Sequence, residues 1–310
     1  MTARDRFADA ERRLFANYGL DCDSRLLRLK DPAISIGVRE FGTGEPLVFI
    51  HGSGMSGATW APVIAHLPDC RSIAIDLPGF GSSDAYSYAG QPLRAHATAQ
   101  LTSVLDAMGL ERAALVGTSL GGMWALCMAA DAPERVRAVV SIGMPAVALP
   151  GVRGDPFFTL LTIPGLGRIA SRVMPPPKSA RAVRRAMKGV IGQAALDRTP
   201  DEFCDVVSAG MRMPGWRDAM WTHLNLALRL GRARPENNLS DDELRSIASP
   251  VHFIWGQDDV YGGPEIGQRA TELIPQARLD VIPGNHAPFL DDPERCAALI
   301  MDAVAPRKLA

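Results

Sequence analysis

The sequence predicts an α/β protein built on a largely parallel sheet. Segments of helical periodicity alternate with short apolar runs at residues 47–50, 72–76, 113–117, 136–142 and 251–255. Each run ends in a turn containing glycine, proline, aspartate or serine, which is typical of buried strands in a parallel sheet. The carboxyl ends of such strands meet at one edge, so we expect the functional residues in these turns.

Length and composition limit the class of protein. The 310 residues are enough for one elaborated domain or a core with an insertion, and 47% hydrophobic and 22% charged residues are ordinary for a globular chain. No apolar run is long enough to span a bilayer. The first residues lack the apolar core of a secretory signal, so a cytoplasmic location is expected.

Charge and cysteine content point to a small-molecule partner. The 33 basic and 34 acidic residues give no electrostatic footprint for nucleic acid. The five cysteines are widely spaced and form no Cys-x-x-Cys pair, so neither a zinc site nor a disulfide framework is indicated. No metal or cofactor is expected, and the oligomeric state is left open, with a homo-oligomer allowed.

The first part of the chain predicts a helix followed by strands. Residues 3–18 have an amphipathic pattern, and we expect their apolar face to pack on the protein's own core rather than in a dimer or on a membrane. Strands are predicted at 26–29 and 34–39. A helix is predicted over 93–108, with His96 off its apolar stripe and therefore solvated or in a capping role.

Residues 145–235 interrupt the alternating pattern. They carry no strand signal and predict helices over 155–170, 178–195, 201–213 and 216–231. We therefore expect a helical insertion, 145–235, in a core made of 1–144 and 236–310. The core pattern then resumes with a capping box at Ser240 and Glu243, a strand at 277–282 and a helix at 293–304.

The insertion has two features that bear on a ligand. It is rich in methionine and tryptophan, which could wall an apolar pocket or simply pack as helix core; the candidates for the pocket are Met144, Met211, Trp216 and Met220. It is also basic between residues 151 and 190. A solvated outer face is favoured there over an arginine that holds a substrate carboxylate.

The most informative stretch is Gly117-Thr118-Ser119-Leu120-Gly121, between a strand pattern and a helix pattern. Two glycines let strand and helix pass close together while Ser119 is held on a sharp turn with its hydroxyl exposed. The amide of Leu120 opens the following helix, where unpaired N–H groups favour an anion. This arrangement predicts a nucleophilic serine with half of an oxyanion hole.

A second glycine-rich loop, His51-Gly52-Ser53-Gly54, follows the strand at 47–50. Its glycines, Gly52 and Gly54, allow backbone N–H groups to point at a bound oxyanion, and the Ser53 amide is the candidate complement to Leu120. We interpret His51 as a residue that supports this loop rather than as a base.

Two further residues complete a possible triad. A serine needs a base to take its proton, and the base needs a carboxylate to fix its tautomer. Ser119, Asp259 and His286 occur in this order, each just after a predicted strand, and a parallel sheet would bring the three together. Asp258 is the neighbouring candidate for the acid.

These motifs, with Asp76-Leu77-Pro78-Gly79-Phe80-Gly81, Trp255-Gly256-Gln257-Asp258-Asp259 and Gly284-Asn285-His286, resemble the α/β-hydrolase superfamily. The resemblance implies the α/β-hydrolase fold: a mostly parallel eight-stranded sheet flanked by helices, with a helical cap after the sixth strand. It implies hydrolysis through an acyl-serine intermediate, with Ser119 as nucleophile, His286 as base and Asp259 as acid. The family's usual spacing from the glycine of this loop favours Asp259 over Asp258.

The resemblance also narrows the branch. A serine at 119 argues against haloalkane dehalogenases and epoxide hydrolases, which carry aspartate there. Carbon–carbon hydrolases of aromatic degradation have a similar cap and His-Gly loop, but Thr118 and Ala287 stand where they usually have asparagine and tryptophan. A carboxylesterase or lactonase acting on a small ester-like molecule is therefore expected. The alternatives are a carbon–carbon hydrolase, a perhydrolase side activity, and a non-hydrolytic ligand-binding protein on the same fold.

Overall fold

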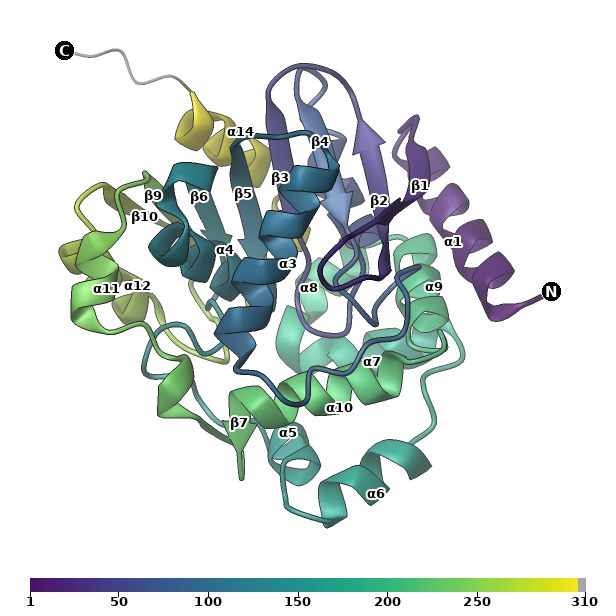
Figure 1. Cartoon of the computed structure of the whole chain (residues 1–310). Helices are drawn as coiled ribbons and strands as arrows, with labels where there is room; N and C mark the ends of the chain where they lie inside the picture. Colours follow the sequence, from purple (N-terminus) through teal and green to yellow (C-terminus); the bar gives the residue numbers. More distant parts are fainter. Residues whose placement is uncertain (306–310) are drawn as a thin grey trace.

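The computed structural model describes residues 1–305, and its centre is one eight-stranded sheet (Figure 1). In the order β1-β2-β4-β3-β5-β6-β9-β10, only β2 runs antiparallel to its neighbours, so the predicted mostly parallel sheet is confirmed. The strands are β1 Asp23–Arg28, β2 Ser35–Phe41, β3 Pro46–Ile50, β4 Arg71–Ile75, β5 Ala113–Thr118, β6 Val136–Ile142, β9 Val251–Gly256 and β10 Ala277–Ile282.

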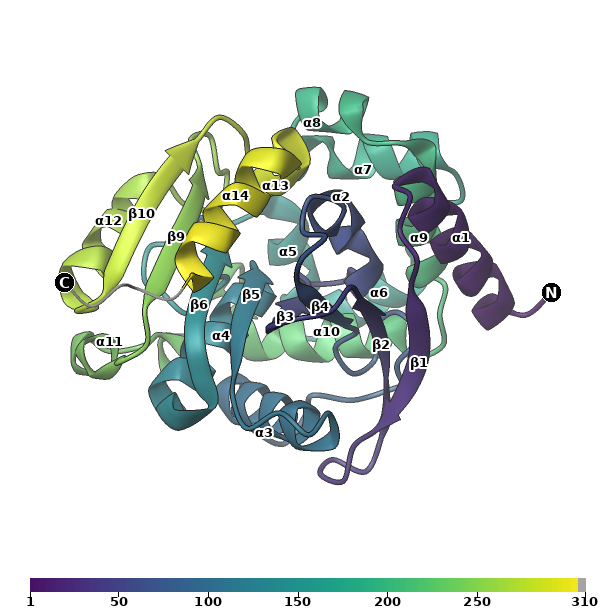
Figure 2. The same cartoon turned by 90° about the horizontal axis from the view of Figure 1, so that it is seen from above.

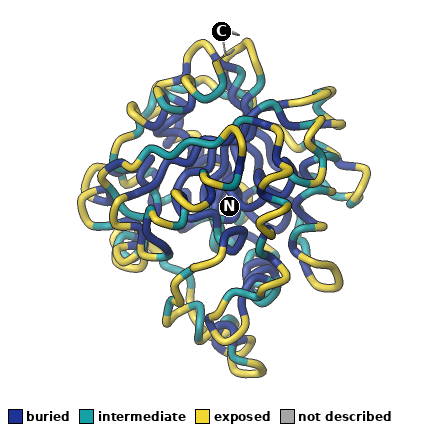
Figure 3. The backbone as a smooth tube through the Cα atoms, turned by 90° about the vertical axis from the view of Figure 1, so that its left-hand side faces the viewer, coloured by how far each residue is buried: buried dark blue, intermediate teal, exposed yellow. Residues whose placement is uncertain are grey.

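Helices cover both faces of this sheet (Figure 2). On one face lie α3 (Leu93–Ala107), α4 (Leu120–Asp131) and α12 (Pro264–Leu273), with the short α11 (Asp241–Ser246) nearby. On the other lie α1 (Ala3–Asn17), α2 (Ala61–Ile64), α13 (Pro288–Asp291) and α14 (Pro293–Val304). The two faces have separate hydrophobic cores, and the central strands are the most deeply buried part of the chain (Figure 3).

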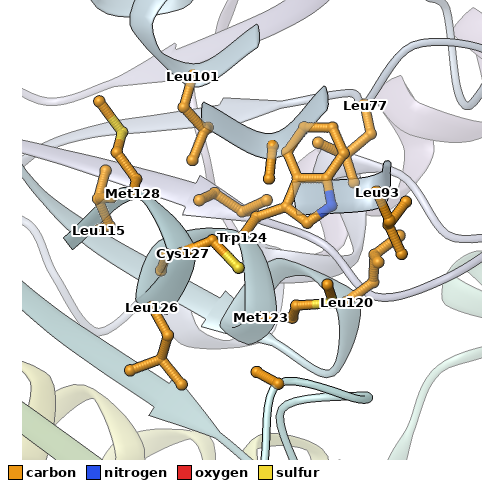
Figure 4. Close-up of a cluster of buried hydrophobic side chains, with 14 of the residues drawn as sticks. Leu77, Leu93, Leu101, Leu115, Leu120, Met123, Trp124, Leu126, Cys127 and Met128 are labelled. Atoms are coloured by element: carbon orange, nitrogen blue, oxygen red, sulfur yellow. The ribbon is translucent and has the colours of Figure 1, made fainter. Parts of the chain in front are cut away.

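Helix α4 is the helix that begins directly after Ser119, and ten of its twelve residues are buried. Trp124, Met123 and Leu126 pack with residues of α3 and β5 in one apolar cluster (Figure 4). A helix that is apolar all round must be enclosed by protein. Its first turn is therefore held rigidly beneath the candidate nucleophile.

The amphipathic helix α1 packs on the protein's own core, as its pattern predicts. Phe7 and Leu14 are buried in the core on the side of α2 and α14. The buried Glu11 pairs with Arg39 of β2 at 2.5 Å, and Arg39 pairs with Asp76 at 2.7 Å. Burial raises the pKa of Glu11 to about 7, although the guanidinium of Arg39 opposes that rise. The sequence patterns gave no indication of this ion-pair chain, which ties α1 to the loop after β4.

The segment between β6 and β9 is mainly helical. It contains α5 (Pro156–Leu161), α6 (Leu166–Val173), α7 (Ala180–Ile191), α8 (Gln193–Arg198), α9 (Asp201–Gly210) and α10 (Trp216–Ala227). The expectation of single helices over 155–170 and 178–195 was wrong, because Gly165 and Gly192 interrupt them at φ 77° and 89°. The expectation of no strand was also wrong. A two-residue turn at Leu230 and Gly231 joins β7 (Leu228–Arg229) to β8 (Arg232–Ala233).

These helices do not form one layer. Helices α5, α6 and α10 lie together at the carboxyl end of the sheet (Figure 1), whereas α9 packs on α1. The basic side chains on this segment are mostly solvated, as expected: those of Arg168, Arg172, Lys178, Arg181, Arg185 and Lys188 are exposed.

One expectation outside the segment was wrong. His96 is buried, with Nε2 2.9 Å from the carbonyl oxygen of Tyr88, because the loop before α3 folds over that side of the helix.

Candidate active site

Ser119 lies on a strained turn between β5 and α4. Its φ of 52° and ψ of −115° fall in a region that L-residues rarely adopt. The neighbouring glycines permit the turn: a Cβ on Gly117 would lie 2.3 Å from the carbonyl carbon of Gly121, and a Cβ on Gly121 would lie 2.1 Å from the carbonyl oxygen of Ile50. Strand β3, strand β5 and α4 therefore cross at a distance that excludes any side chain.

The carboxylate of Asp259 lies against His286. Both residues follow strands of the core, β9 and β10. Nδ1 of His286 lies 3.0 and 2.9 Å from the two carboxylate oxygens, and the amides of Met144 and Tyr261 donate to the same carboxylate at 2.8 and 3.0 Å. Burial alone would raise the pKa of Asp259, but these hydrogen bonds lower it below its ordinary value. The alternative acid, Asp258, is exposed, and its side chain does not take part in this pair.

The carboxylate fixes the orientation of His286. An ionised carboxylate can only accept, so in the neutral imidazole Nδ1 carries the proton and Nε2 presents a lone pair. This Nε2 is buried and has no hydrogen-bond partner among residues 1–305. The ring of Tyr261 packs edge-on against the imidazole, with centroids 4.6 Å apart. An unpartnered lone pair in a cavity that also contains Ser119 is suited to accept a proton from the serine hydroxyl.

The loop after β3 passes directly over Ser119. A Cβ on Gly52 would lie 3.3 Å from the Cβ of Ser119, so only a glycine lets the backbone come this close without displacement. His51 holds the loop from behind: Nδ1 lies 2.7 Å from the Gly52 carbonyl oxygen, and Nε2 accepts from the Leu77 amide at 2.9 Å. Burial lowers the pKa of His51 to about 4. The side chain has both nitrogens occupied and is neutral, which fits a supporting role.

Helix α10 fastens the same loop from the other side. Trp216 donates from Nε1 to the carbonyl oxygen of Gly54 at 2.9 Å. Nε2 of His223 lies 3.0 Å from Oγ of Ser53. The sulfur of Met220 would lie 3.5 Å from a Cβ on Gly54. The inserted helices thus contact the loop beside Ser119 directly.

A narrow cavity of about 60 Å³ opens onto Ser119 and His286. It lies between the core and the inserted segment, and its lining is mostly apolar. The lining residues are Ser53, Ser119, Leu120, Met144, Ala146, Val147, Val152, Arg153, Asp155, Phe158, His223, Leu224, Ala227, Leu228, Tyr261 and His286. This volume is well below the roughly 300–1,000 Å³ of ordinary ligand pockets.

The structure places one of the four expected pocket residues at this cavity. Met144 lines it, whereas Trp216 and Met220 pack on the loop at Gly54, and Met211 borders a separate surface hollow with Pro176 and Arg217. The reason is the orientation of α10, which turns a different face, containing His223 and Leu224, toward Ser119.

Sequence reasoning missed His223 and Tyr261. His223 could have been noticed as a lone imidazole in a helix that also presents Met220, Leu224 and Ala227 on its buried side. Tyr261 could have been noticed because it stands two residues after Asp259, in the turn that must hold the acid. Neither position belongs to a motif with a known spacing, so the signal was weak.

Comparison with known proteins identifies the family. Residues 47–299 match the model of the alpha/beta hydrolase family, and the chain belongs to this family. The chain is 29% identical over 247 residues to a 2-hydroxy-6-oxononadienedioate/2-hydroxy-6-oxononatrienedioate hydrolase of Burkholderia vietnamiensis, covering 77% of this chain and 80% of that protein.

Solved structures give the same fold. The carboxylesterase CesB of Bacillus subtilis superposes with a TM-score of 0.77 at 22% identity, covering 98% of this chain and 99% of that one. The meta-cleavage product hydrolase CumD of Pseudomonas fluorescens gives 0.71 at 21% identity, covering 90% and 96%. These structures share the fold, and the family match together with the sequence relative supports the hydrolase class; both esterases and carbon–carbon hydrolases are among the similar proteins.

Among residues 1–305, no helix combines the length and apolar character needed to cross a bilayer. The same part of the chain brings no three His, Cys, Asp or Glu side chains together as a metal-ligating group.

Proposed function

We propose that this protein is a serine hydrolase that cleaves a small carboxylic ester or lactone through an acyl-serine intermediate. One observation carries the proposal. The buried pair of Asp259 and His286 presents an unpartnered Nε2 to the cavity that contains the strained Ser119. We further propose that residues 145–235 act as a cap on a core formed by 1–144 and 236–310.

The chemistry follows from the roles of these groups. His286 Nε2 takes the proton of the Ser119 hydroxyl as Oγ bonds to the substrate carbonyl carbon. The carbonyl oxygen gains the electron pair and is stabilised by the amides of Leu120 and Ser53. When the tetrahedral intermediate collapses, the bond to the alkoxy oxygen breaks, and that oxygen receives the proton from His286. Water then attacks the acyl-serine by the same steps, which releases the acid and regenerates Ser119.

Charge at the cavity favours an uncharged substrate. Arg153 is the only cationic side chain among the lining residues in the described part of the chain, and it is 59% exposed and 3.6 Å from Glu265. Asp155 lines the same cavity, so the local charge is balanced. A carboxylate would have to leave water without a buried cation to receive it, which is costly. A neutral ester or lactone avoids this cost.

A carbon–carbon hydrolase is the second candidate, because the relative from Burkholderia vietnamiensis has that activity in its name. In this alternative, His286 and Ser119 act on a ketone rather than an ester, and Arg153 holds the acidic group of the substrate. This alternative requires that Arg153 turn inward, away from Glu265.

Matched substrates distinguish the ester hydrolase from the carbon–carbon hydrolase. We expect a neutral p-nitrophenyl ester to be hydrolysed with a higher kcat/KM than its analogue bearing a free acid, and Arg153→Ala to change the ratio less than twofold. Arg172→Ala, at an exposed position on α6, is the control. A strong preference for the acid that Arg153→Ala removes, together with cleavage of 2-hydroxy-6-oxo-2,4-heptadienoate, would establish the carbon–carbon alternative. A protein that processes neither class would instead be a ligand-binding member of the family.

A further inference from the structure

Three groups form a hydrogen-bond chain that leads from α10 to the cavity. Nδ1 of His223 lies 3.0 Å from the carbonyl oxygen of Ala219, and Nε2 lies 3.0 Å from Oγ of Ser53. A carbonyl oxygen can only accept, so Nδ1 must carry the proton. In a neutral ring Nε2 is then an acceptor, and the hydroxyl of Ser53 is the donor.

The surroundings keep the imidazole neutral and in place. His223 is 1% exposed, and the rings of Phe80 and Tyr88 pack against it edge-on, with centroids 5.6 and 5.9 Å away. Burial lowers the pKa of His223 to about 4. The ring therefore cannot become a second donor at neutral pH, and the direction of the hydrogen bonds is fixed.

The fixed direction determines what Ser53 can offer to a ligand. A serine hydroxyl has one hydrogen and two lone pairs. The hydrogen is directed to His223, so only lone pairs remain for a group in the cavity that Ser53 lines. Ser53 Oγ thus acts there as an acceptor, and a carbonyl, ether or carboxylate oxygen placed beside it would meet lone pairs rather than a proton.

The position of this acceptor specifies which part of the substrate it meets. Oγ and the amide nitrogen of one serine are separated by about 3 Å, since three covalent bonds join them. In the proposed function the Ser53 amide donates to the oxygen of the scissile carbonyl. The substrate atom that meets Ser53 Oγ should therefore lie two or three bonds from the oxygen of the scissile carbonyl. A hydroxyl oxygen on the carbon next to the carbonyl lies at this separation.

We propose that Ser53 Oγ is an acceptor subsite that selects substrates with a hydroxyl on the carbon adjacent to the scissile carbonyl, and that His223 is its positioning residue. The substrate class is then 2-hydroxy acyl esters or the corresponding lactones. This inference rests on the proposed function, because it uses the Ser53 amide as part of the oxyanion hole.

The test compares three p-nitrophenyl esters: 2-hydroxypropanoate, 2-methoxypropanoate and propanoate. Each kcat/KM is divided by the rate of hydroxide-catalysed hydrolysis of the same ester, which removes differences in intrinsic reactivity. A neutral hydrogen bond typically changes an equilibrium or rate by about fivefold to tenfold. We expect the wild type to prefer the hydroxy ester over both others by at least about fivefold.

Three variants then test whether Ser53 and His223 cause the preference for the hydroxy ester. Ser53→Ala removes the acceptor, and His223→Phe keeps a ring but lets the Ser53 hydroxyl turn its proton into the cavity; both should lose the preference. His223→Gln places a carbonyl oxygen near the position of Nε2 and should retain most of it. Equal losses in His223→Gln and His223→Phe would show that an acceptor at this position does not set the preference, and would overturn the role of His223. If His223→Phe does not fold, Ser53→Ala and His223→Gln still decide.

Failure of this inference differs from failure of the proposed function. If the wild type hydrolyses propanoate through Ser119 but shows no preference for the hydroxy ester, only the acceptor subsite is wrong. If it hydrolyses none of the three esters and Ser119 does not react with a fluorophosphonate, the proposed function is wrong, and the subsite is rejected with it.

Discussion

Replacing Asp259 by asparagine tests the candidate acid at a position where the structure sets both the cost in activity and the cost in stability. The carboxylate accepts from His286 Nδ1 with both oxygens, from the Met144 amide with Oδ2 and from the Tyr261 amide with Oδ1. An asparagine has only one acceptor oxygen, so in either orientation its amide group faces a backbone N–H. We expect a loss of about 1–3 kcal/mol in the free energy of unfolding, from one buried donor left without an acceptor.

The loss of activity should be much larger than this loss of stability. An asparagine cannot hold the Nδ1-protonated tautomer of His286 or stabilise the imidazolium, and such a change in a triad lowers kcat by about 10⁴, or about 5.5 kcal/mol. The assay is p-nitrophenyl ester hydrolysis, with urea denaturation to confirm folding. Asp258→Asn is the matched control, because Asp258 is exposed one residue away. A folded Asp259→Asn with near-normal kcat, or a large loss in Asp258→Asn, would refute the reasoning.

Three further predictions concern the cavity, the turn at Ser119 and the dependence of stability on pH. The cavity of about 60 Å³ should give the highest kcat/KM with acyl chains of two to four carbons, and a steady rise through octanoyl would contradict the described cavity. Gly121→Ala should prevent stable folding, because its Cβ would lie 2.1 Å from the Ile50 carbonyl oxygen. Gly189→Ala in α7 is the control, because its Cβ meets open space and should stabilise the folded protein by about 0.5–1 kcal/mol. Thermal unfolding of both variants measures the difference. Burial lowers the pKa values of His51 and His223 from about 6.5, the ordinary value, to about 4 in the folded state, so the unfolded chain binds more protons between these limits. Their stabilisation should be complete above about pH 6.5 and lost as pH falls toward 4, by roughly 3 kcal/mol each. Urea denaturation at pH 7.5 and 4.5 should show a smaller fall for His223→Phe, and an equal fall would contradict the assignment.

The sequence predicted the parts of the fold in which local pattern and tertiary environment agree. The buried strands β3, β5 and β9 are continuous apolar runs, and glycines mark the turn at Ser119, so both signals were strong. Ser119, Asp259 and His286 each follow a predicted strand, and for this reason we expected them at one edge of the sheet. In the structure, Asp259 contacts His286, and His286 lines one cavity together with Ser119.

The inserted segment was less predictable for physical reasons. Helical periodicity continues across Gly165 and Gly192, and the helices are interrupted there because glycine readily adopts a positive φ. Which face of α10 meets the cavity depends on how Trp216 docks on Gly54, which is a tertiary contact without a local signal. The methionine-rich composition was therefore a poor guide to the pocket, and His223 was overlooked. Burial of His96 has a similar origin, because it depends on the path of the loop before α3, which contains Tyr88.

The most direct test of the central claim is to trap the acyl-enzyme. The protein is mixed with a slowly hydrolysed p-nitrophenyl ester, quenched in acid, digested and examined by mass spectrometry. The proposed function predicts one acyl group, on the peptide containing Ser119, and neither the adduct nor turnover in Ser119→Ala. A Ser119→Ala protein that still turns over the ester, or an acyl group found only on another residue, would contradict it.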